Sequence, residues 1–243
     1  MKNYDLQVSV KYFAESNLGD DSEPDQFCLR MRAGIFGSYL DAAPEEEAFS
    51  LPLGSVNFTL VRMGNALEAN FPMREVFDLS QEMTDIAAAL FDSSYEEMKP
   101  TVTKTFPYAD FSGDLLVIES LDLEAFARGQ RLGLSVIYRI IQDWESGCSL
   151  TVIQPHPERM GNTGDEIPGG VGDEFGFSEG SSGDSKDDLD RYFSDLGFKR
   201  IPESRFLGLP SSMARPPIFE LALPGGLEIT EEALQSFRTE NQE

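Results

Sequence analysis

The residues with the clearest chemical potential form a short basic loop in the middle of the chain. Positions 128–133 read RGQRLG, which places two guanidinium groups and two glycines close together. The loop lies between an expected strand and an expected helix, and a helix start carries backbone N–H groups without partners inside the helix. Such amides bind anions, and a phosphate-sized anion fits them best. The alternative is a solvated basic loop on an acidic protein.

A second group with chemical potential is the carboxyl of Glu119. It is the only acid in the apolar part of the preceding segment, which reads LLVIESLDL at positions 115–123. A carboxylate on such a strand is a candidate general base, because it can take a proton from a substrate held nearby. The alternative is a structural salt bridge with Arg30 or Arg32.

Two regular elements are expected to position these groups. Residues 115–118 are uniformly apolar and 119–123 alternate, which predicts a central strand covered on both faces for part of its length. The spacing then predicts an amphipathic helix over 132–144, with Gly147 at its end. The apolar row of this helix, with members four residues apart, is Leu132, Val136, Ile140 and Trp144.

Strand, loop and helix together resemble the central segment of the GNAT superfamily of acetyl-CoA-dependent N-acetyltransferases. In that family a strand ending Leu-x-Val is followed by the pattern Arg/Gln-x-x-Gly-x-Gly/Ala. Here LDL at 121–123 precedes Arg128 at the expected spacing, and Gly133 holds the final position. Arg131 stands where the family has its middle Gly.

Two further segments extend the resemblance to about 113–209. The expected strand SLTVI at 149–153 directly follows the helix, and LDRYFSDLGFK at 189–199 is similar to the family's short helix ending in Leu-Gly-Phe. The family often places a Tyr five residues ahead of that Phe. Here the position holds Phe193, and Tyr192 lies one residue earlier.

The resemblance implies an α/β (α+β) fold: a mixed, mostly antiparallel central sheet flanked by helices, with a V-shaped split between the two central parallel strands. It implies acetyl-CoA as a co-substrate, no metal, and an oxyanion donor at a backbone N–H near Leu121. Within this scheme Glu119 is the candidate catalytic base and Tyr192 the candidate catalytic acid. The implied cofactor-binding residues are Leu121, Leu123, Arg128, Gly129, Gln130, Arg131, Leu132, Gly133 and Leu134.

The resulting functional hypothesis is an N-acetyltransferase that moves an acetyl group from acetyl-CoA to an amine. The acidic surface favours a cationic small molecule or peptide as acceptor. Arg131 and Phe193 at motif positions favour an alternative, a catalytically inactive GNAT-like protein that binds acyl-CoA or a basic protein partner. A further alternative is an acidic mimic of nucleic acid that occupies the groove of a basic protein.

Composition bounds these hypotheses. A chain of 243 residues with 40% hydrophobic content can bury one substantial core. Its 19 basic and 43 acidic residues give a net charge of −24, which argues against general binding to nucleic acid or an anionic membrane. No apolar run has transmembrane length, and the N-terminus lacks the apolar core of a signal peptide. Cys28 and Cys148 fit reduced thiols in a cytoplasmic protein.

The remaining sequence divides into segments around the central one. Residues 1–112 are expected to carry strands, a helix at about 79–91 and an irregular stretch on the acceptor side of the same domain. Residues 113–223 form the expected acyl-CoA-binding core, with a flexible, acidic, Gly-rich insertion at about 158–186. Residues 224–243 are expected to form an amphipathic helix and tail.

Overall fold

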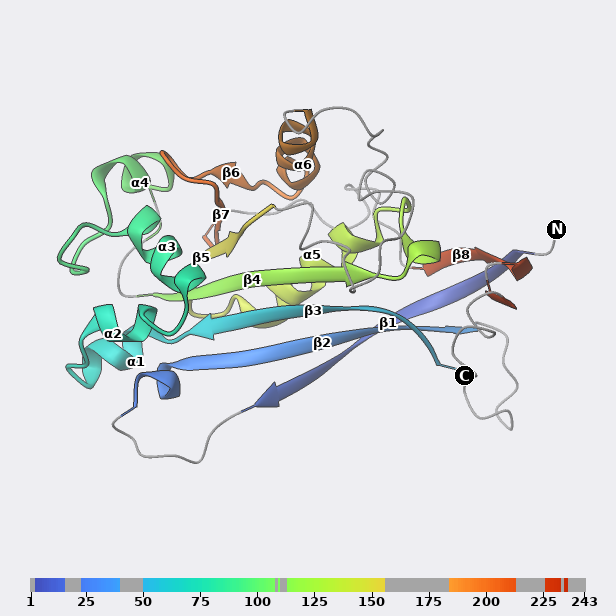
Figure 1. The fold of residues 1–243 in the computed structure, drawn as a ribbon, viewed down its shortest axis with the longest axis horizontal. Coiled ribbons are helices and arrows are strands. Elements are labelled where there is room, and N and C mark those ends of the chain that lie inside the picture. Colours follow the sequence, from blue (N-terminus) through green and yellow to red (C-terminus); the bar gives the residue numbers. More distant parts are fainter. Residues whose placement is uncertain are drawn as a thin grey trace.

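The computed structural model describes residues 3–15, 23–39, 50–107, 109, 113–155, 184–212, 226–232, 234 and 235. Within these residues the strands form one open, eight-stranded sheet with the order β6-β7-β5-β4-β3-β2-β1-β8 (Figure 1). The strands are β1 (Asn3–Glu15), β2 (Cys28–Tyr39), β3 (Leu51–Val61), β4 (Asp114–Leu123), β5 (Cys148–Ile153), β6 (Lys199–Arg200), β7 (Leu207–Pro210) and β8 (Gly226–Thr230).

The α-helices of the described residues are α1 (Met63–Glu68), α2 (Met73–Phe77), α3 (Gln81–Leu90), α4 (Pro100–Thr105), α5 (Leu132–Trp144) and α6 (Asp184–Ser194). Two short 3-10 helices, η1 (Pro24–Phe27) and η2 (Ala125–Ala127), precede β2 and follow β4. None of the helices in the described part of the chain is long and apolar enough to cross a membrane.

Strand direction in this sheet is mixed. β4 and β5 are parallel, and every other pair of neighbours is antiparallel. A parallel pair needs a crossover connection, and α5 supplies it between β4 and β5. The expected mixed, mostly antiparallel sheet flanked by helices is therefore confirmed.

The two faces of the sheet carry separate hydrophobic cores. On one face α5 and α6 pack over alternate residues of β2, β3 and β4. Tyr12 joins this core from β1: its ring lies edge-on to Trp144 at 5.5 Å, and its hydroxyl donates to Asp143 Oδ2 at 2.7 Å. Burial of Tyr12, followed by that hydrogen bond, raises the pKa of its hydroxyl. Helix α5 is thus held against β1 as well as β4.

The opposite face is covered by α1–α4 at one end only. These helices pack on β4 and β5 through Leu115, Val117, Leu150 and Val152, and Figure 1 shows them gathered where β3 ends and β4 begins. Toward the other end of this face, β2 and β3 present polar residues, because their apolar residues alternate toward α5.

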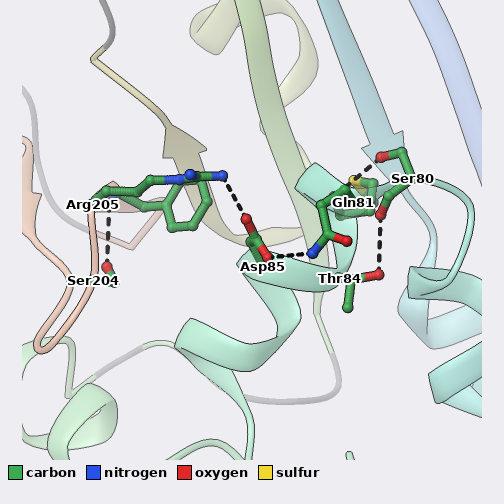
Figure 2. A network of polar contacts seen from close by, with 8 residues as sticks. Ser80, Gln81, Thr84, Asp85, Ser204 and Arg205 are labelled. Atoms are coloured by element: carbon green, nitrogen blue, oxygen red, sulfur yellow. Dashed lines mark hydrogen bonds and ion pairs between the residues drawn. The ribbon is translucent and has the colours of Figure 1, made fainter.

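Helix α3 is tied to the β6–β7 hairpin by the polar network drawn in Figure 2. Ser80 caps the helix, because its Oγ accepts from the Met83 N–H at 3.2 Å. Asp85 accepts from Gln81 Nε2 at 2.7 Å and pairs with Arg205 at 2.5 Å. At this end of the sheet, which we call the helical end, the ion pair between Asp85 and Arg205 therefore joins α3 to the β6–β7 hairpin.

Several elements differ from the sequence expectations. The stretch after α3 was expected to be irregular up to 112 but contains α4, which starts with Pro100 in its first turn. The predicted C-terminal segment from 224 begins as β8, whose Leu227 and Ile229 are buried against β1. Apart from Asp184 onward, which begins α6, the predicted acidic insertion lies outside the described residues.

Candidate functional site

Two residues of the loop between β4 and α5 have positive φ, as residues of anion-binding loops often do. Gly129 and Arg131 have φ values of 76° and 60°, while Gln130 between them does not have positive φ. Backbone of alternating hand points successive N–H groups toward one side, which is the geometry of an anion nest. Arg131 adopts the left-handed conformation at the N-cap of α5, at the position where the resemblance places a Gly.

Five successive N–H groups of this loop have no acceptor in the described part of the chain. From Gly129 to Gly133, no backbone N–H makes a hydrogen bond to another described residue. The next amide, of Leu134, donates to the Tyr192 hydroxyl at 3.2 Å. Buried or half-buried amides normally have partners, so a run of open donors at a helix start is a ready site for an anion.

The arginine side chains are used for structure rather than pointed into the concavity. Arg128 turns back toward β4, where its Nε donates to the Leu123 carbonyl at 2.9 Å. Arg131 forms an ion pair with Asp195, which follows α6. The sequence suggested that both guanidinium groups add charge to the anion site, but the open donors there are backbone amides.

Gln130 also has a structural partner. Its Nε2 donates to the Glu228 carbonyl at 2.8 Å, and its Oε1 accepts from the Glu228 N–H at 3.2 Å. The middle of the loop is therefore fastened to the backbone of β8.

The parallel strands beside the loop pair over only part of their length. Pairing between β4 and β5 runs to Ile118 and Ile153, whereas β4 continues to Leu123 alongside β3 alone. Successive peptide groups of a strand point to alternate neighbours. Half of the peptide groups from Glu119 to Leu123 therefore face the side where β5 has ended. Leu121 and Leu123 are buried in the core under α5, so only their backbone can meet a ligand.

Glu119 occupies an irregularity at the point where β4 and β5 stop pairing. In the β3–β4 register, Asn57 faces Ser120 and Phe58 faces Ile118, which leaves Glu119 as the extra residue of a β-bulge. Bulges re-aim side chains and are common beside active sites. The Glu119 Oε1 accepts from Thr59 Oγ1 at 2.6 Å. No ion pair within the described residues includes Glu119, so the alternative of a salt bridge with Arg30 or Arg32 does not hold there.

The side-chain amide of Gln154 is buried directly after β5, next to the place where β4 and β5 stop pairing. Gln154 is 5% exposed, and its Oε1 has no hydrogen-bond partner among the described residues. A buried acceptor without a partner costs free energy unless a ligand or water satisfies it. The open Gln154 Oε1 therefore indicates that a hydrogen-bond donor of a ligand can bind at the end of β5.

Tyr192 lies on α6, with its hydroxyl at the first turn of α5. Its neighbour Phe193, at the position where the resemblance often has Tyr, is fully buried in the core. The expected assignment of Tyr192 as catalytic acid stays a prediction, and its hydrogen bond places it beside the anion loop.

A cavity on the opposite face of the sheet was missed by sequence reasoning. Its volume is about 620 Å³, and residues of β1, β2, β3 and β4 line it. Glu119 lines it from β4 and Asn57 from β3, while Arg30 and Arg32 line it from β2. The alternation of Arg30 and Arg32 on β2 was visible in the sequence, but the cavity depends on four strands and on the bulge.

Neither the two cysteines nor any cluster of metal-binding side chains adds a second reactive centre among the described residues. Burial raises the pKa of both the Cys28 and Cys148 thiols to about 12, so neither is a nucleophile near neutral pH. Burial also raises the pKa of Asp122, against the lowering effects of Arg128 and Arg32. Within the described residues no group of three or more His, Cys, Asp or Glu side chains could hold a metal ion.

Comparison with known proteins adds no family to this description: the chain matches no protein-family model, no curated protein and no solved structure.

Proposed function

We propose that this protein is a GNAT-like N-acetyltransferase that transfers the acetyl group of acetyl-CoA to an amine. One observation carries the proposal: the open amides from Gly129 to Gly133 lie at the start of α5, directly after the strand that outlasts its parallel neighbour. A diphosphate needs several N–H donors on one side, and this loop supplies them.

The co-substrate is proposed to bind where β4 runs on beyond its pairing with β5, the place of the expected V-shaped split. Its pyrophosphate accepts hydrogen bonds from the amides of 129–133, and its pantetheine arm runs beside the unpaired edge of β4. The amides of pantetheine can donate to the orphaned Gln154 Oε1 and can pair with the backbone of 119–123 as a short strand would. This arrangement satisfies groups that are otherwise open.

The proposed chemistry is a direct transfer. Glu119 takes a proton from the ammonium of the acceptor, and the freed nitrogen lone pair attacks the thioester carbonyl carbon. The resulting oxyanion accepts a hydrogen bond from a backbone N–H near Leu121. The C–S bond then breaks, and the thiolate of CoA takes up a proton, for which Tyr192 is the proposed donor. The nitrogen gives up its second proton as the amide forms, and this proton restores the Tyr192 hydroxyl.

The bulge supports the role of Glu119 in this scheme. It lets Glu119 line the cavity on the face opposite α5, while the neighbouring Ile118 and Leu121 stay in the core under α5. The acceptor is proposed to enter from the cavity, and acetyl-CoA from the α5 side.

One observation favours a second candidate, a GNAT-like protein that binds acyl-CoA without turning it over. The hydroxyl of Tyr192 is hydrogen-bonded to the Leu134 amide at 3.2 Å, near the proposed phosphate end of the co-substrate rather than its thioester end. A protein of this kind would bind acetyl-CoA and give no acetylated amine. Both candidates fit the cytoplasm, where acetyl-CoA and reduced thiols such as Cys28 occur together.

Calorimetric titration with acetyl-CoA tests both candidates. We expect saturable binding by the wild type and at least roughly tenfold weaker binding by Arg131→Glu, which puts a carboxylate beside the proposed diphosphate. The matched control is Arg139→Glu, with the same charge change on an exposed part of α5. Folded wild-type protein that gives no heat would remove the proposal. An acetyl-transfer assay over an amine panel then separates enzyme from binding protein.

A further inference from the structure

The cavity on the polar part of the sheet has a regular floor. Across β2, β3 and β4, the register aligns Arg32 with Asn57 and Asn57 with Ser120. Arg30 faces Thr59 in the next row, and Thr59 holds Glu119 through its hydroxyl. Two cationic side chains therefore stand on β2, and a carboxylate stands two strands away, ~10 Å at the backbone level.

Arg30 and Arg32 form no ion pair among the described residues. Glu15 stands opposite Arg30 in the β1–β2 register, and the charge of Arg32 partly offsets the burial that raises the pKa of Asp122. Among the described residues Arg30 makes no hydrogen bond, and Arg32 donates to Ser55 Oγ at 3.4 Å. Four other arginines of the described residues, Arg131, Arg139, Arg200 and Arg205, each contact an aspartate. On a chain with a net charge of −24, these two neighbouring arginines line a cavity without being held in an ion pair of the described residues.

The wall above the arginines is aromatic. Phe13 on β1 is 56% exposed and lines the cavity together with Phe36 on β2. Phe36 can lie over the sheet because its neighbour is Gly34, where an added Cβ would come within 2.7 Å of the Phe36 ring. Lys11 brings a further cation, with its Nζ 4.7 Å from the centre of the Phe36 ring. An exposed aromatic wall next to unpaired cations fits an apolar ligand that carries an anionic group.

We propose that this cavity binds a small amino carboxylate, with its carboxylate on Arg30 and Arg32, its apolar body against Phe13 and Phe36, and its amine toward Glu119. Guanidinium groups bind carboxylates through paired, charge-assisted hydrogen bonds. A singly charged carboxylate suits the site better than a doubly charged phosphate, because Glu119 lines the same cavity. The position of the amine rests on the proposed acetyl transfer; the binding of the carboxylate does not.

This inference revises the acceptor expected from composition. The net charge of −24 favoured a cationic acceptor. Inside the cavity, however, two arginines face one acidic residue among the lining side chains, so the local charge is opposite to that of the whole chain. Local charges decide the recognition of a ligand at contact distance, whereas net charge acts on its approach.

The test is calorimetry without acetyl-CoA, on probes whose amine and carboxylate are held apart. The probes are 4-aminobutanoate, 6-aminohexanoate and 4-(aminomethyl)benzoate, each compared with its carboxamide. We expect at least one acid to bind about tenfold more tightly than its carboxamide, and the double variant Arg30→Gln/Arg32→Gln to remove that preference. The control is Arg74→Gln, a single substitution of the same type on the exposed side of α2. We expect it to keep the preference for the acid over the carboxamide.

The outcomes separate this inference from the proposed function. If no acid binds better than its carboxamide, or if the preference survives in the double variant, the carboxylate site is wrong. Arg30→Lys/Arg32→Lys keeps the charge and loses the paired geometry, so partial retention of the preference there supports direct contact. If acetyl-CoA does not bind but the acid preference is present, the acetyltransferase proposal fails and the cavity assignment stands.

Discussion

The two ends of the sheet treat their arginines in opposite ways. At the helical end, Arg205 pairs with Asp85 and lies over the Phe206 ring at 5.3 Å, and Asp85 is held again by Gln81 (Figure 2). At the cavity end, Arg30 and Arg32 line a cavity with aromatic residues and form no ion pair among the described residues. Paired charges hold elements together, whereas unpaired charges around a cavity remain available for a ligand.

The largest expected effect on this comparison comes from Glu119→Gln. We expect acetyl transfer to fall roughly 100-fold or more, because a general base contributes about that much, while acetyl-CoA affinity stays unchanged. Steady-state kinetics and calorimetry measure the two quantities. Asp85→Asn, at the helical end, is the control and should keep the wild-type turnover. Equal turnover in Glu119→Gln and wild type would exclude Glu119 as the base.

A backbone substitution should break the cavity floor. Gly54 has a φ of 147°, and an added Cβ would lie 2.1 Å from the Asp122 carbonyl oxygen on β4. We expect Gly54→Ala to lower the free energy of unfolding by roughly 2 kcal/mol or more, measured by urea denaturation. Gly147→Ala is the matched control, since its φ is 90° but an added Cβ meets nothing within 4 Å. Equal losses would mean that contact with β4 does not matter.

Neutralising arginines should affect the two ends differently. Arg205→Gln removes the partner of Asp85, and we expect a loss of at most about 1 kcal/mol in the free energy of unfolding, because the pair is partly exposed. Arg30→Gln/Arg32→Gln should cause a smaller loss, since it breaks no ion pair of the described residues and removes only the attraction between Arg32 and Asp122. Urea denaturation of both variants at one pH makes the comparison. A larger loss in the double variant would show that the cavity arginines are structural.

The smallest effects are expected in the pH dependence of stability. Burial raises the pKa of Asp122 in the folded state, so the folded protein binds this proton more tightly than the unfolded chain does. Its contribution to stability is therefore greatest at low pH and declines as pH rises above the unfolded value, about 3.9. Asp122→Asn should gain stability relative to wild type as pH rises from 4 to 7.

Asp92, in the turn after α3, should show the opposite sign. The hydrogen bond from Ser94 lowers the pKa of its carboxyl, so its contribution is present above the unfolded value and is lost as pH falls through the folded value. Asp92→Asn should therefore lose stability relative to wild type at neutral pH and approach it in acid. Urea denaturation across this pH range checks both variants, and parallel curves would contradict the assignment.

The central segment was predictable from sequence because local signals agree there. Helix α5 spans 132–144, as its apolar row indicated, and Gly147 takes the positive φ expected after a helix. The parallel pairing of β4 with β5 was implied by the resemblance rather than by this pattern. Short helices were not predictable: α4 is only six residues long and depends on the burial of Val102 in the core rather than on its own periodicity.

The candidate site was predictable in its loop and not in its cavity. The loop is contiguous, so its glycines and helix start could be recognised from spacing alone. The unpaired state of Arg30 and Arg32 depends on which side chains of β3 and β4 stand opposite, and the bulge at Glu119 shifts that register by one residue. The hydrophobic pattern of this segment is compatible with either register, so it does not predict the bulge.

The two hydrogen bonds between the Gln130 side chain and the Glu228 backbone have a consequence for self-association. An outer strand presents unpaired backbone groups on which a foreign chain can assemble. On β8, both backbone groups of Glu228 are already held by the Gln130 side-chain amide, which imitates a further strand. An incoming chain would first have to displace Gln130 and so disturb the loop 128–133. Strand addition at β8 should therefore weaken phosphate binding by the loop, and bound phosphate should in turn oppose strand addition.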